Sequence, residues 1–581
     1  MLKNYFPIFH WLPNYKKAYL TNDIVAGLTV GIMLIPQGMA YAMIAGLPPV
    51  FGLYAALVPQ VIYALMGTSR QLAVGPVAMD SLLVASGLTA LSLSGIEEYI
   101  SMAIFLSLFM GVIQLSLGLL RAGFLVNFLS KPVISGFTSG AAIIIGLSQL
   151  KHVLGVDIPR NNKVHQLLFN VIEKFKEINI YTVTIATIAI LIILLIKKLN
   201  KRYRINIPGA LLVVLFGILT VYGLELYHSD VKIIGVVPDG LPAFKIPNIS
   251  LHTVAELTPI AITLALVAFM EAISVAKAVQ EKQNEYEVYA NQELIALGTS
   301  NIIGSLFQSY PTTGGFSRTA VNEQAGAKTG ISSMVSAVIV GSTLLFFTSL
   351  FHYLPNAVLG AIIMVAVFGL IDFKYPVELL KKRKDEFVLL LVTFLITISV
   401  GITQGIILGI LFSLLLMVYR VSKPHIAVIA RIEGTNYYNN INRFHSSVAI
   451  RKDVLGIRID AQLFFGNTTF FKKALLKEIK LKGKHLKLLI INTEAISYID
   501  NTAANMLYKM IQELKQKNIK VMFSGTTGPT RDILFKSGII DILGKENLFL
   551  RSHEAEDFYD GKHNRTEKFR SIAEQTESIA S

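Results

Sequence analysis

Two short polar stretches lie inside otherwise apolar sequence, one in each half of the chain, and both contain glycine. They are Ser69–Ala78 (SRQLAVGPVA) and Tyr310–Arg318 (YPTTGGFSR). Backbone within a bilayer must be hydrogen-bonded, so a helix is interrupted there only where the break lines a cavity. Paired breaks in two halves of a membrane protein mark a substrate site. Because a helix that begins at such a break presents free N–H groups, the pair predicts an anion site.

Glu271 is the most informative carboxylate, because it lies in the middle of the apolar run Ala268–Ala272 (AFMEA). An ionisable residue inside a membrane span is costly to bury unpaired and is therefore a candidate functional group. A buried glutamate can take up a proton, so we predict that Glu271 binds the coupling proton. Sodium is an alternative, since carboxylate and backbone oxygens also suit that ion. A structural salt bridge between Glu271 and Arg318 is a further alternative, and it is compatible with coupling.

Asp80 is a second carboxylate in an apolar segment, about one turn into the third predicted span. It is a candidate for a second group that binds the coupling ion, for the partner of a buried cation, or for a group that faces a water-filled cavity. A carboxylate this close to an anion site repels the anion unless it is protonated or paired.

The composition indicates a membrane protein and argues against other classes. The chain is 53% hydrophobic and 16% charged, with a mean hydropathy of +0.56, and several uncharged runs are long enough to span a bilayer. The absence of cysteine excludes disulfides, thiolate metal sites and cysteine catalysis. No metal-ligand cluster, phosphate loop or nucleophile–base pair stands out, so we expect no enzyme activity, no cofactor and no bound metal.

We predict fourteen transmembrane spans within residues 23–423, after a cytoplasmic N-terminal segment at 1–22. The spans lie near 24–45, 50–68, 71–93, 99–120, 126–150, 180–197, 207–227, 256–279, 290–309, 312–326, 330–351, 354–372, 385–401 and 403–421. They form two repeats, at about 23–227 and 256–423. Because each repeat has seven spans, an odd number, the second runs inverted relative to the first.

The net charge of +15 follows from this topology. Basic clusters at 197–204 and 381–384, together with Arg420, flank hydrophobic spans on the side that is cytoplasmic if the N-terminus is cytoplasmic. Orientation in a membrane therefore explains the basic residues, and we expect no nucleic-acid partner.

Beyond the last span the sequence becomes soluble in character. Strands are predicted at 455–460, 488–492 and 521–525, and helices at 468–480, 502–517 and 529–536. This alternation is typical of a small α/β domain, which we place at 438–555 on the cytoplasmic side. Residues 560–581 are polar and are predicted to be disordered.

Several motifs resemble the sulfate-permease (SulP) family, in order along almost the whole chain. They are Asp23–Gly31, Ile35–Ala42, Pro48–Tyr54, Gly67–Arg70, Phe307–Pro311, Ser317–Arg318 and Gln324–Thr329. The tail resembles the STAS domain attached to these transporters. The resemblance implies the uracil-transporter-like fold, in which a core domain moves against a gate domain, commonly in a homodimer. It also implies that an anion lies between the half-helices that begin spans three and ten.

The resemblance also assigns substrate-binding residues by position in this sequence. They are Gln37 and Tyr41 in the first span, backbone at Gly75, Val77 and Ala78 in the third, and Gly315, Phe316, Ser317 and Arg318 in the tenth. Some animal relatives have an aromatic residue where Val77 stands, so substrate size is left open. Helix packing for Gln37 and Tyr41, and an ion pair for Arg318, are the structural alternatives.

One residue of the tail is a candidate regulatory site. Thr502 aligns with the phosphorylatable Ser/Thr of anti-sigma-factor antagonists, which STAS domains resemble. STAS domains on transporters often lack that chemistry, and Asp500 or Thr502 is also a good helix N-cap. The cap is the favoured interpretation.

Together these features predict secondary active transport of an inorganic oxyanion, sulfate first, by proton-coupled alternating access. Bicarbonate, chloride-exchange or dicarboxylate transport on the same fold is an alternative, and a non-transporting, membrane-anchored STAS regulator is an alternative of another class. We expect an integral protein of the cytoplasmic (inner) membrane of a bacterium. Its expected partners are a small inorganic anion, a coupling proton or sodium, membrane lipids, a second copy of the chain and a cytosolic STAS partner.

Overall fold

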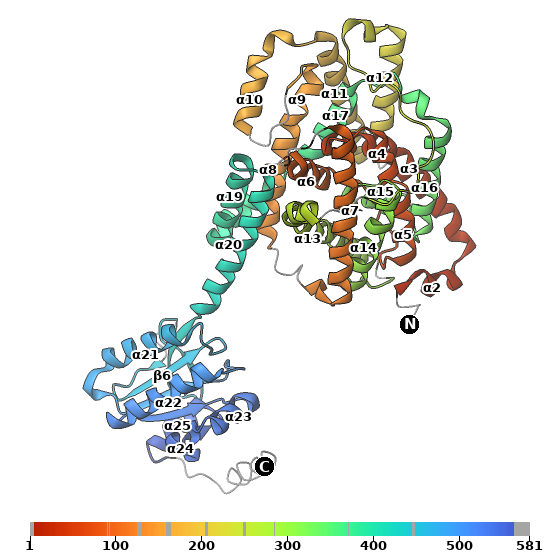
Figure 1. The fold of residues 1–581 in the computed structure, drawn as a ribbon. Helices are drawn as coiled ribbons and strands as arrows, with labels where there is room; N and C mark the ends of the chain where they lie inside the picture. The colour runs from red at the N-terminus through yellow and green to blue at the C-terminus, as the bar shows by residue number, and fades with distance from the viewer. Residues whose placement is uncertain are drawn as a thin grey trace. The chain divides into compact units, whose positions relative to one another are not determined.

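The computed structural model describes residues 5–562, except 90, 92, 94, 125–129, 159–163, 204–206, 248–250, 284, 370 and 444–447. The chain divides into two compact units, Met1–Ser413 and Leu414–Ser581, whose elements are labelled in Figure 1. Most of the predicted disordered tail, from residue 563 on, lies outside the described residues.

The first unit is built almost entirely of helices, and each predicted span contains at least one. In the first half they are α3 (Lys17–Ala45), α4 (Val50–Ala55), α5 (Val58–Met66), α6 (Ala78–Thr89), α7 (Ile96–Leu119), α8 (Lys131–Ser148), α9 (Leu150–Leu154), α10 (Val164–Glu173), α11 (Ile180–Tyr203) and α12 (Gly209–Gly223). In the second half they are α13 (Leu251–Gln283), α14 (Ala290–Leu306), α15 (Phe316–Gln324), α16 (Ile331–Phe346), α17 (Asn356–Phe368), α18 (Lys374–Lys382), α19 (Lys384–Ser399) and α20 (Ile402–Ser422).

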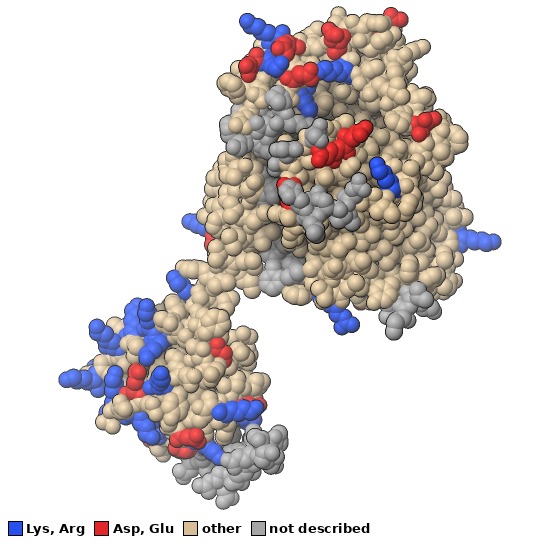
Figure 2. Space-filling view, viewed as in Figure 1, with Lys and Arg blue, Asp and Glu red and all other residues tan. Residues whose placement is uncertain are grey.

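Six of the described helices are long and apolar enough to cross a membrane. They are Lys17–Ala45, Ile96–Leu119, Lys131–Leu154, Ile180–Asn200, Val254–Gln283 and Gln404–Ser422. Other apolar helices are shorter, among them α6, α12, α16 and α17. Figure 2 shows a broad area of the first unit without charged side chains. Exposed apolar residues of this unit, such as Leu219, Val338 and Phe346, suit contact with lipid tails.

The two polar stretches meet in a short antiparallel pair of extended segments. β1 (Val74–Gly75) pairs with β2 (Thr313–Gly314), with Val74 opposite Gly314 and Gly75 opposite Thr313. A further bond runs from the Gly315 N–H to the Ala73 carbonyl, at 3.0 Å. Each extended segment thus satisfies backbone groups of the other, which is what a helix break inside a membrane requires. The third and tenth predicted spans therefore begin late, because α6 starts at Ala78 and α15 at Phe316.

Two buried carboxylates fix loops that the sequence motifs contain. Asp23 on α3 is fully buried and accepts hydrogen bonds from the Lys328 and Thr329 N–H groups, at 2.7 and 3.0 Å. Glu293 on α14 is fully buried and accepts from the Thr68 N–H and the Tyr63 hydroxyl, both at 2.7 Å. Each carboxylate is surrounded by donors, so both have a structural role in holding a loop against a helix.

The second unit contains a seven-stranded sheet with the order β4-β3-β6-β7-β8-β9, and β5 pairs with β3. The strands are β3 (Ile426–Ile432), β4 (Tyr438–Asn440), β5 (Val448–Ala449), β6 (Val454–Ile459), β7 (Leu488–Asn492), β8 (Lys520–Ser524) and β9 (Leu548–Phe549). The helices are α21 (Thr468–Lys482), α22 (Asn501–Gln516), α23 (Gly528–Lys536), α24 (Ile539–Leu543) and α25 (Ser552–Tyr559). β3 runs antiparallel to β6, whereas β6 to β9 are parallel. Because β3 belongs to this sheet, the folded unit extends N-terminal to the predicted start at 438.

Both faces of this sheet are covered. Leu489 and Ile491 of β7 pack in one cluster with residues of α21 and α22, such as Leu475 and Leu507. Leu488 and Ile490 point to the other face, where Ala555 of α25 lies in their cluster. Continuous apolar strands covered by helices on two sides are typical of parallel α/β sheets. The unit therefore has a hydrophobic core of its own.

Candidate anion-binding site

A cavity of about 430 Å³ lies in the first unit, between two groups of helices. One group is α3, α6, α13 and α15, and the other is α11, α12 and α17 (Figure 1). Most of the predicted site residues line it, namely Gln37, Tyr41, Val77, Ala78, Glu271, Gly315, Phe316, Ser317 and Arg318. Two do not: Gly75 lies behind Arg318, and Asp80 is buried inside α6. The structure thus brings together residues that are up to 281 positions apart in the chain.

The cavity follows one face of α3 and one face of α11. Thr29, Met33, Gln37 and Tyr41 line it at intervals of four residues, which places them one above another on a single face of α3. On α11 the lining residues run from Ile193 to Asn200. Tyr41 is only 5% exposed, whereas Lys197 near the end of α11 is exposed. The cavity therefore opens toward the ends where α3 begins and α11 finishes.

Arg318 connects the two half-helices. Its guanidinium is 1% exposed and donates a hydrogen bond from Nη1 to the Pro76 carbonyl, at 2.6 Å. Two glycines make room for it: a Cβ on Gly315 would lie 2.8 Å from Arg318 Nη2, and one on Gly75 would lie 3.4 Å from it. Nε and Nη2 have no hydrogen-bond partner among the described residues. The guanidinium thus joins the starts of α6 and α15 through the Pro76 carbonyl, and its Nε and Nη2 donors are left available for a ligand.

The first turns of both half-helices add backbone donors. In α15 the Thr319 N–H bonds to the Gly315 carbonyl, so the N–H groups of Phe316, Ser317 and Arg318 precede the first bond within the helix. Likewise, the first such bond around α6 joins the Ser81 N–H to the Val77 carbonyl. Phe316 is 62% exposed and Ser317 is exposed. Free N–H groups, a hydroxyl and a guanidinium in one cavity are suited to an oxyanion.

Glu271 and Asp80 form the acidic part of the site. Glu271 lines the cavity, and its Oε2 is buried without a hydrogen-bond partner among the described residues. Asp80 is 0% exposed, both of its oxygens lack such a partner, and Glu271 is the charged group that it faces. The salt bridge that we considered between Glu271 and Arg318 is not formed in this structure. Arg318 and Glu271 therefore line the same cavity without direct pairing, and Asp80 lies buried behind its wall.

Several contributors to the site have no signal of their own in the sequence. Thr313 donates from its hydroxyl to the Ala268 carbonyl of α13 at 2.6 Å, and the hydroxyls of Tyr310 and Ser81 lie 3.0 Å apart. The first contact fixes β2 against α13, the helix that carries Glu271, and the second joins α6 to the segment that precedes β2. On the opposite wall, Ile193, Ile362 and Val365 are apolar residues of ordinary spans. Met33 and Thr29 line the cavity from α3, the helix of Gln37. Their spacing of four residues before Gln37 is the sequence signal that could have placed them there.

In the second unit, Asp500 is the N-cap of α22. Its Oδ1 accepts a hydrogen bond from the Ala503 N–H at 2.7 Å, and its Oδ2 accepts from the Phe465 N–H at 2.8 Å. Thr502 is exposed in the first turn of the helix. The cap is Asp500, one of the two residues named for that role, and a regulatory role for Thr502 stays a prediction.

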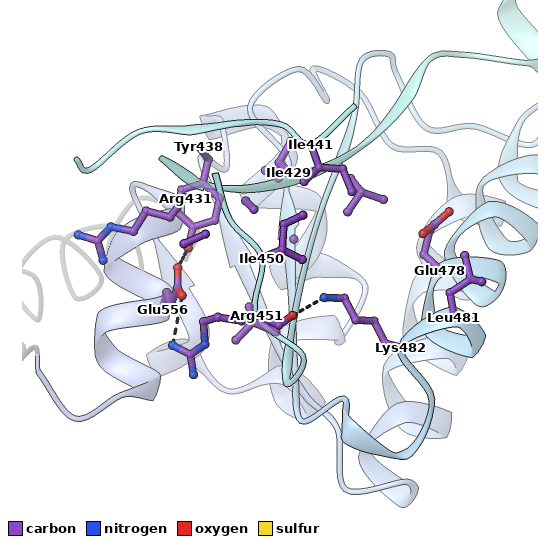
Figure 3. Close-up of a pocket in the computed structure, with 15 residues that line it drawn as sticks. Ile429, Arg431, Tyr438, Ile441, Ile450, Arg451, Glu478, Leu481, Lys482 and Glu556 are labelled. Carbon is purple, nitrogen blue, oxygen red and sulfur yellow. Dashed lines mark hydrogen bonds and ion pairs between the residues drawn. The ribbon is translucent and has the colours of Figure 1, made fainter. Parts of the chain in front are cut away.

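The second unit also contains a small pocket, of about 160 Å³, shown in Figure 3. Most of its charged side chains pair with one another or with neighbouring residues. Arg451 pairs with Asp453, Glu556 and Asp560, Arg431 pairs with Asp557, and Tyr438 donates to Glu556. Burial raises the pKa of Glu556, and the nearby Arg431 opposes that rise. With its charges paired internally, this pocket is a structural ion-pair network that joins α25 to the sheet.

Comparisons with known proteins agree with the fold and with the motifs. The sulfate permease family matches over residues 20–393 and the STAS domain over residues 445–555. Sulfate transporter 4.1, chloroplastic, of Arabidopsis thaliana is 36% identical over 564 residues, which cover 95% of this chain and 82% of the relative. High affinity sulfate transporter 2 of Stylosanthes hamata is 32% identical over 571 residues, covering 95% and 86%.

A solved structure resembles both units. It is the murine solute carrier 26 family member A9 anion transporter in the inward-facing state, with a TM-score of 0.89 and 26% identity, covering 96% of this chain and 94% of that chain. The recognised family and the fold class of a polytopic helical membrane protein with a C-terminal STAS domain are thereby confirmed, and the division into seven plus seven spans stays a prediction. On these matches, the chain belongs to the sulfate permease family.

Proposed function

We propose that this protein carries an inorganic oxyanion, sulfate first, across the membrane by proton-coupled alternating access. Relatives that span nearly the whole chain are named sulfate transporters, which supports anion transport. The observation that carries the proposal is the buried Arg318, whose Nε and Nη2 lack partners where two half-helices begin. An anion placed there meets cationic N–H donors that nothing else uses.

The proposed binding geometry uses donors from two helices, α15 and α3. The anion accepts from the first-turn N–H groups of α15, from Arg318 and from Ser317, while Gln37 and Tyr41 face it from α3. The Gln37 Oε1 is buried without a partner, which fits an amide that turns its NH₂ group into the cavity. These are several moderate contacts without a closed cage, and a transported ion must leave as well as enter.

Proton coupling follows from the position of Glu271. An ionised carboxylate beside the anion repels it, and it is costly to keep buried without a partner. A protonated Glu271 removes both penalties, so proton and anion bind together and favour each other. Without either ligand, Glu271 is free to approach Arg318, which provides a resting pair. Asp80, which faces Glu271, is the second candidate for the coupling ion, and sodium is the alternative ion.

Alternating access is proposed for the two helix groups that line the cavity. One group carries the half-helices and Glu271, and the other contributes mostly apolar wall residues, with Lys197 and Asn200 near the end of α11. A rigid movement of one group past the other moves the site without disturbing its donors. Since the cavity opens toward the basic end of α11, which we predict to be cytoplasmic, the conformation is proposed to be inward-facing.

Three further points belong to the proposal. Bicarbonate, chloride exchange and dicarboxylates remain alternative substrates, because backbone donors specify charge more than identity. A homodimer, a cytoplasmic N-terminus and a cytoplasmic STAS domain are proposed from family resemblance. The cytoplasmic membrane of a bacterium stays a proposal, since the relatives named here are plant proteins.

The deciding experiment is uptake of radiolabelled sulfate into proteoliposomes that contain the purified protein. An inward proton gradient, an inward sodium gradient and no gradient are compared, with protein-free liposomes as the blank. Accumulation that requires the proton gradient supports the proposal. Accumulation of bicarbonate or a dicarboxylate instead replaces the substrate, and no transport of any anion favours the membrane-anchored regulator.

A further inference from the structure

A stripe of lysines runs along the outer face of α21 in the second unit. Lys473, Lys477 and Lys480 are exposed, and Lys484 continues the series in the turn that follows the helix. At 3.6 residues per turn, the three helical lysines fall within about 60° of one another. They lie on the side of α21 opposite Phe471 and Leu475, which are fully buried against the sheet. We call these four residues the lysine stripe.

The stripe is not neutralised by the protein. None of its four lysines forms an ion pair among the described residues, whereas neighbouring Lys472 pairs with Glu513 at 3.4 Å. The one acidic residue within α21, Glu478, lines the pocket of Figure 3 and so lies on another face of the helix. Figure 2 shows Lys and Arg gathered on the side of the unit where Figure 1 places α21.

The helix begins beside the end of the last span. The side chain of Asn467, which precedes α21, donates through Nδ2 to the carbonyl of Val421 in α20, at 3.5 Å. Asn467 is fully buried, and α20 ends at Ser422, only a few residues before β3. The segment Gln404–Ser422 is one of the candidate membrane spans. The start of α21 therefore lies close to the C-terminal end of α20.

From this placement we propose that the lysine stripe binds the anionic lipid headgroups of the leaflet in which α20 ends. Unpaired lysines close to the end of a span are attracted by the negative potential of such a leaflet. Leu481, 70% exposed beside the stripe, provides an apolar contact at the same surface. Binding of this kind fixes the STAS unit to the membrane surface and makes its position depend on lipid charge and salt. The inference does not depend on which anion is transported.

The test uses the full chain in vesicles and exploits its lack of cysteine. A fluorophore on Leu481→Cys reports contact with lipids that carry a headgroup quencher, and a fluorophore on exposed Asp541→Cys of α24 is the reference position. We expect quenching at position 481 to be at least about threefold stronger with 30% anionic lipid than with zwitterionic lipid alone, and to fall with added salt. The reference position should not respond.

Charge variants separate the stripe from net charge. Replacing Lys473, Lys477, Lys480 and Lys484 by Gln should abolish the lipid-dependent quenching. The matched variant replaces four exposed lysines elsewhere in the unit, Lys509, Lys515, Lys517 and Lys536, and should retain it. Equal quenching in both lipids, or equal loss in both variants, overturns the proposal. So does energy transfer between labelled copies that is independent of lipid charge, because it would mean that the stripe faces a second chain.

Discussion

Arg318 of α15 donates a hydrogen bond to the backbone carbonyl of Pro76 at 2.6 Å, across 242 positions of sequence. This single contact joins the two half-helices at the point where both begin. Its Nε and Nη2 have no hydrogen-bond partner within the part of the chain that the structure describes. Arg318 therefore both joins the starts of the two half-helices and offers hydrogen-bond donors to the cavity. We expect substitutions of Arg318 to weaken anion binding more than they destabilise the fold.

Replacing Arg318 by Lys tests this division. Lysine keeps the positive charge but lacks the planar fork that contacts a carbonyl and an oxyanion together. We expect the KM for anion uptake to rise at least about tenfold with the thermal midpoint lowered only slightly. Uptake kinetics in proteoliposomes and a thermal unfolding curve in detergent measure the two effects. An unchanged KM would leave Arg318 with a structural role alone.

Gly315→Ala perturbs the same guanidinium without changing any charge. The added methyl would lie 2.8 Å from Arg318 Nη2, so the guanidinium must shift, and we expect roughly tenfold weaker anion binding. Gly341→Ala on α16 is the control, because its added methyl meets only Leu57 and Leu241 side chains, at 3.4 Å or more. Equal anion affinity in the two variants would mean that the position of Arg318 is unimportant for binding.

Glu271→Gln should uncouple transport from the proton gradient. The amide resembles the protonated acid in shape and charge, so anion binding and exchange of labelled for unlabelled anion should persist. Concentrative uptake should be lost, because the variant cannot release and rebind a proton. Comparing counterflow with gradient-driven uptake in the same vesicles separates the two. Concentrative uptake at the original level would remove Glu271 from the coupling step.

The sequence indicated which residues line the cavity better than it indicated the backbone contacts that hold them in place. Glycine and proline in apolar surroundings marked both helix breaks, and the interval between Gln37 and Tyr41 placed two side chains on one face. The pairing of Val74 with Gly314 joins segments from different halves, and no local pattern indicates such a register. The predicted span at 71–93 begins before α6, which starts at Ala78. The residues just before α6 are mostly apolar, and apolar sequence alone does not show whether a short segment is helical or extended.

Other features were missed because their signals are ambiguous. The wall residues Ile193 and Val365 are apolar, as lipid-facing residues of a span also are. Only the tertiary structure therefore shows that they face a cavity. Asp23 and Glu293 accept bonds from backbone N–H groups of distant loops, which any sequence supplies. β3 follows α20 after a short turn and lies before residue 438, so the domain predicted at 438–555 did not include it.

Asp80→Asn tests a buried carboxylate that has no hydrogen-bond partner. Removing an unpaired charge from a buried position should not destabilise the protein, and we expect the thermal midpoint to stay equal or to rise by a few degrees. If Asp80 shares the coupling ion with Glu271, the pH dependence of anion affinity should become shallower. Affinity titrations across pH 5 to 8 measure this. A lower midpoint would reveal a partner, and an identical pH profile would exclude Asp80 from coupling.

The acid stability of the STAS unit should depend on Arg451. Arg451 Nη2 lies 2.8 Å from Asp453 Oδ2, and its Nη1 lies 2.8 Å from Asp560 Oδ1. The Arg451 hydrogen bond lowers the pKa of Asp453, although burial opposes it. Burial also acts to raise the pKa of Asp560, but hydrogen bonds from Arg451 and Lys562 outweigh it and lower that pKa. Carboxyls with lowered pKa stabilise the fold at pH values above their unfolded pKa of about 3.9, and this stabilisation is lost as the pH falls through the folded values.

Arg451→Gln should therefore destabilise the unit by about 1 kcal/mol at pH 7, a modest figure because these side chains are partly exposed to solvent. The difference from the unchanged protein should shrink as the pH falls below the unfolded pKa of about 3.9 and through the lowered pKa of the two aspartates. Urea unfolding of residues 424–562, which have their own core, measures it between pH 2.5 and 7. Lys562→Gln is the control, because its contact with Asp560 is 3.3 Å long and 69% of its side chain is exposed, so almost no change is expected. A destabilisation by Arg451→Gln that is the same at every pH would mean that packing of its stem, and not its ion pairs, stabilises the unit.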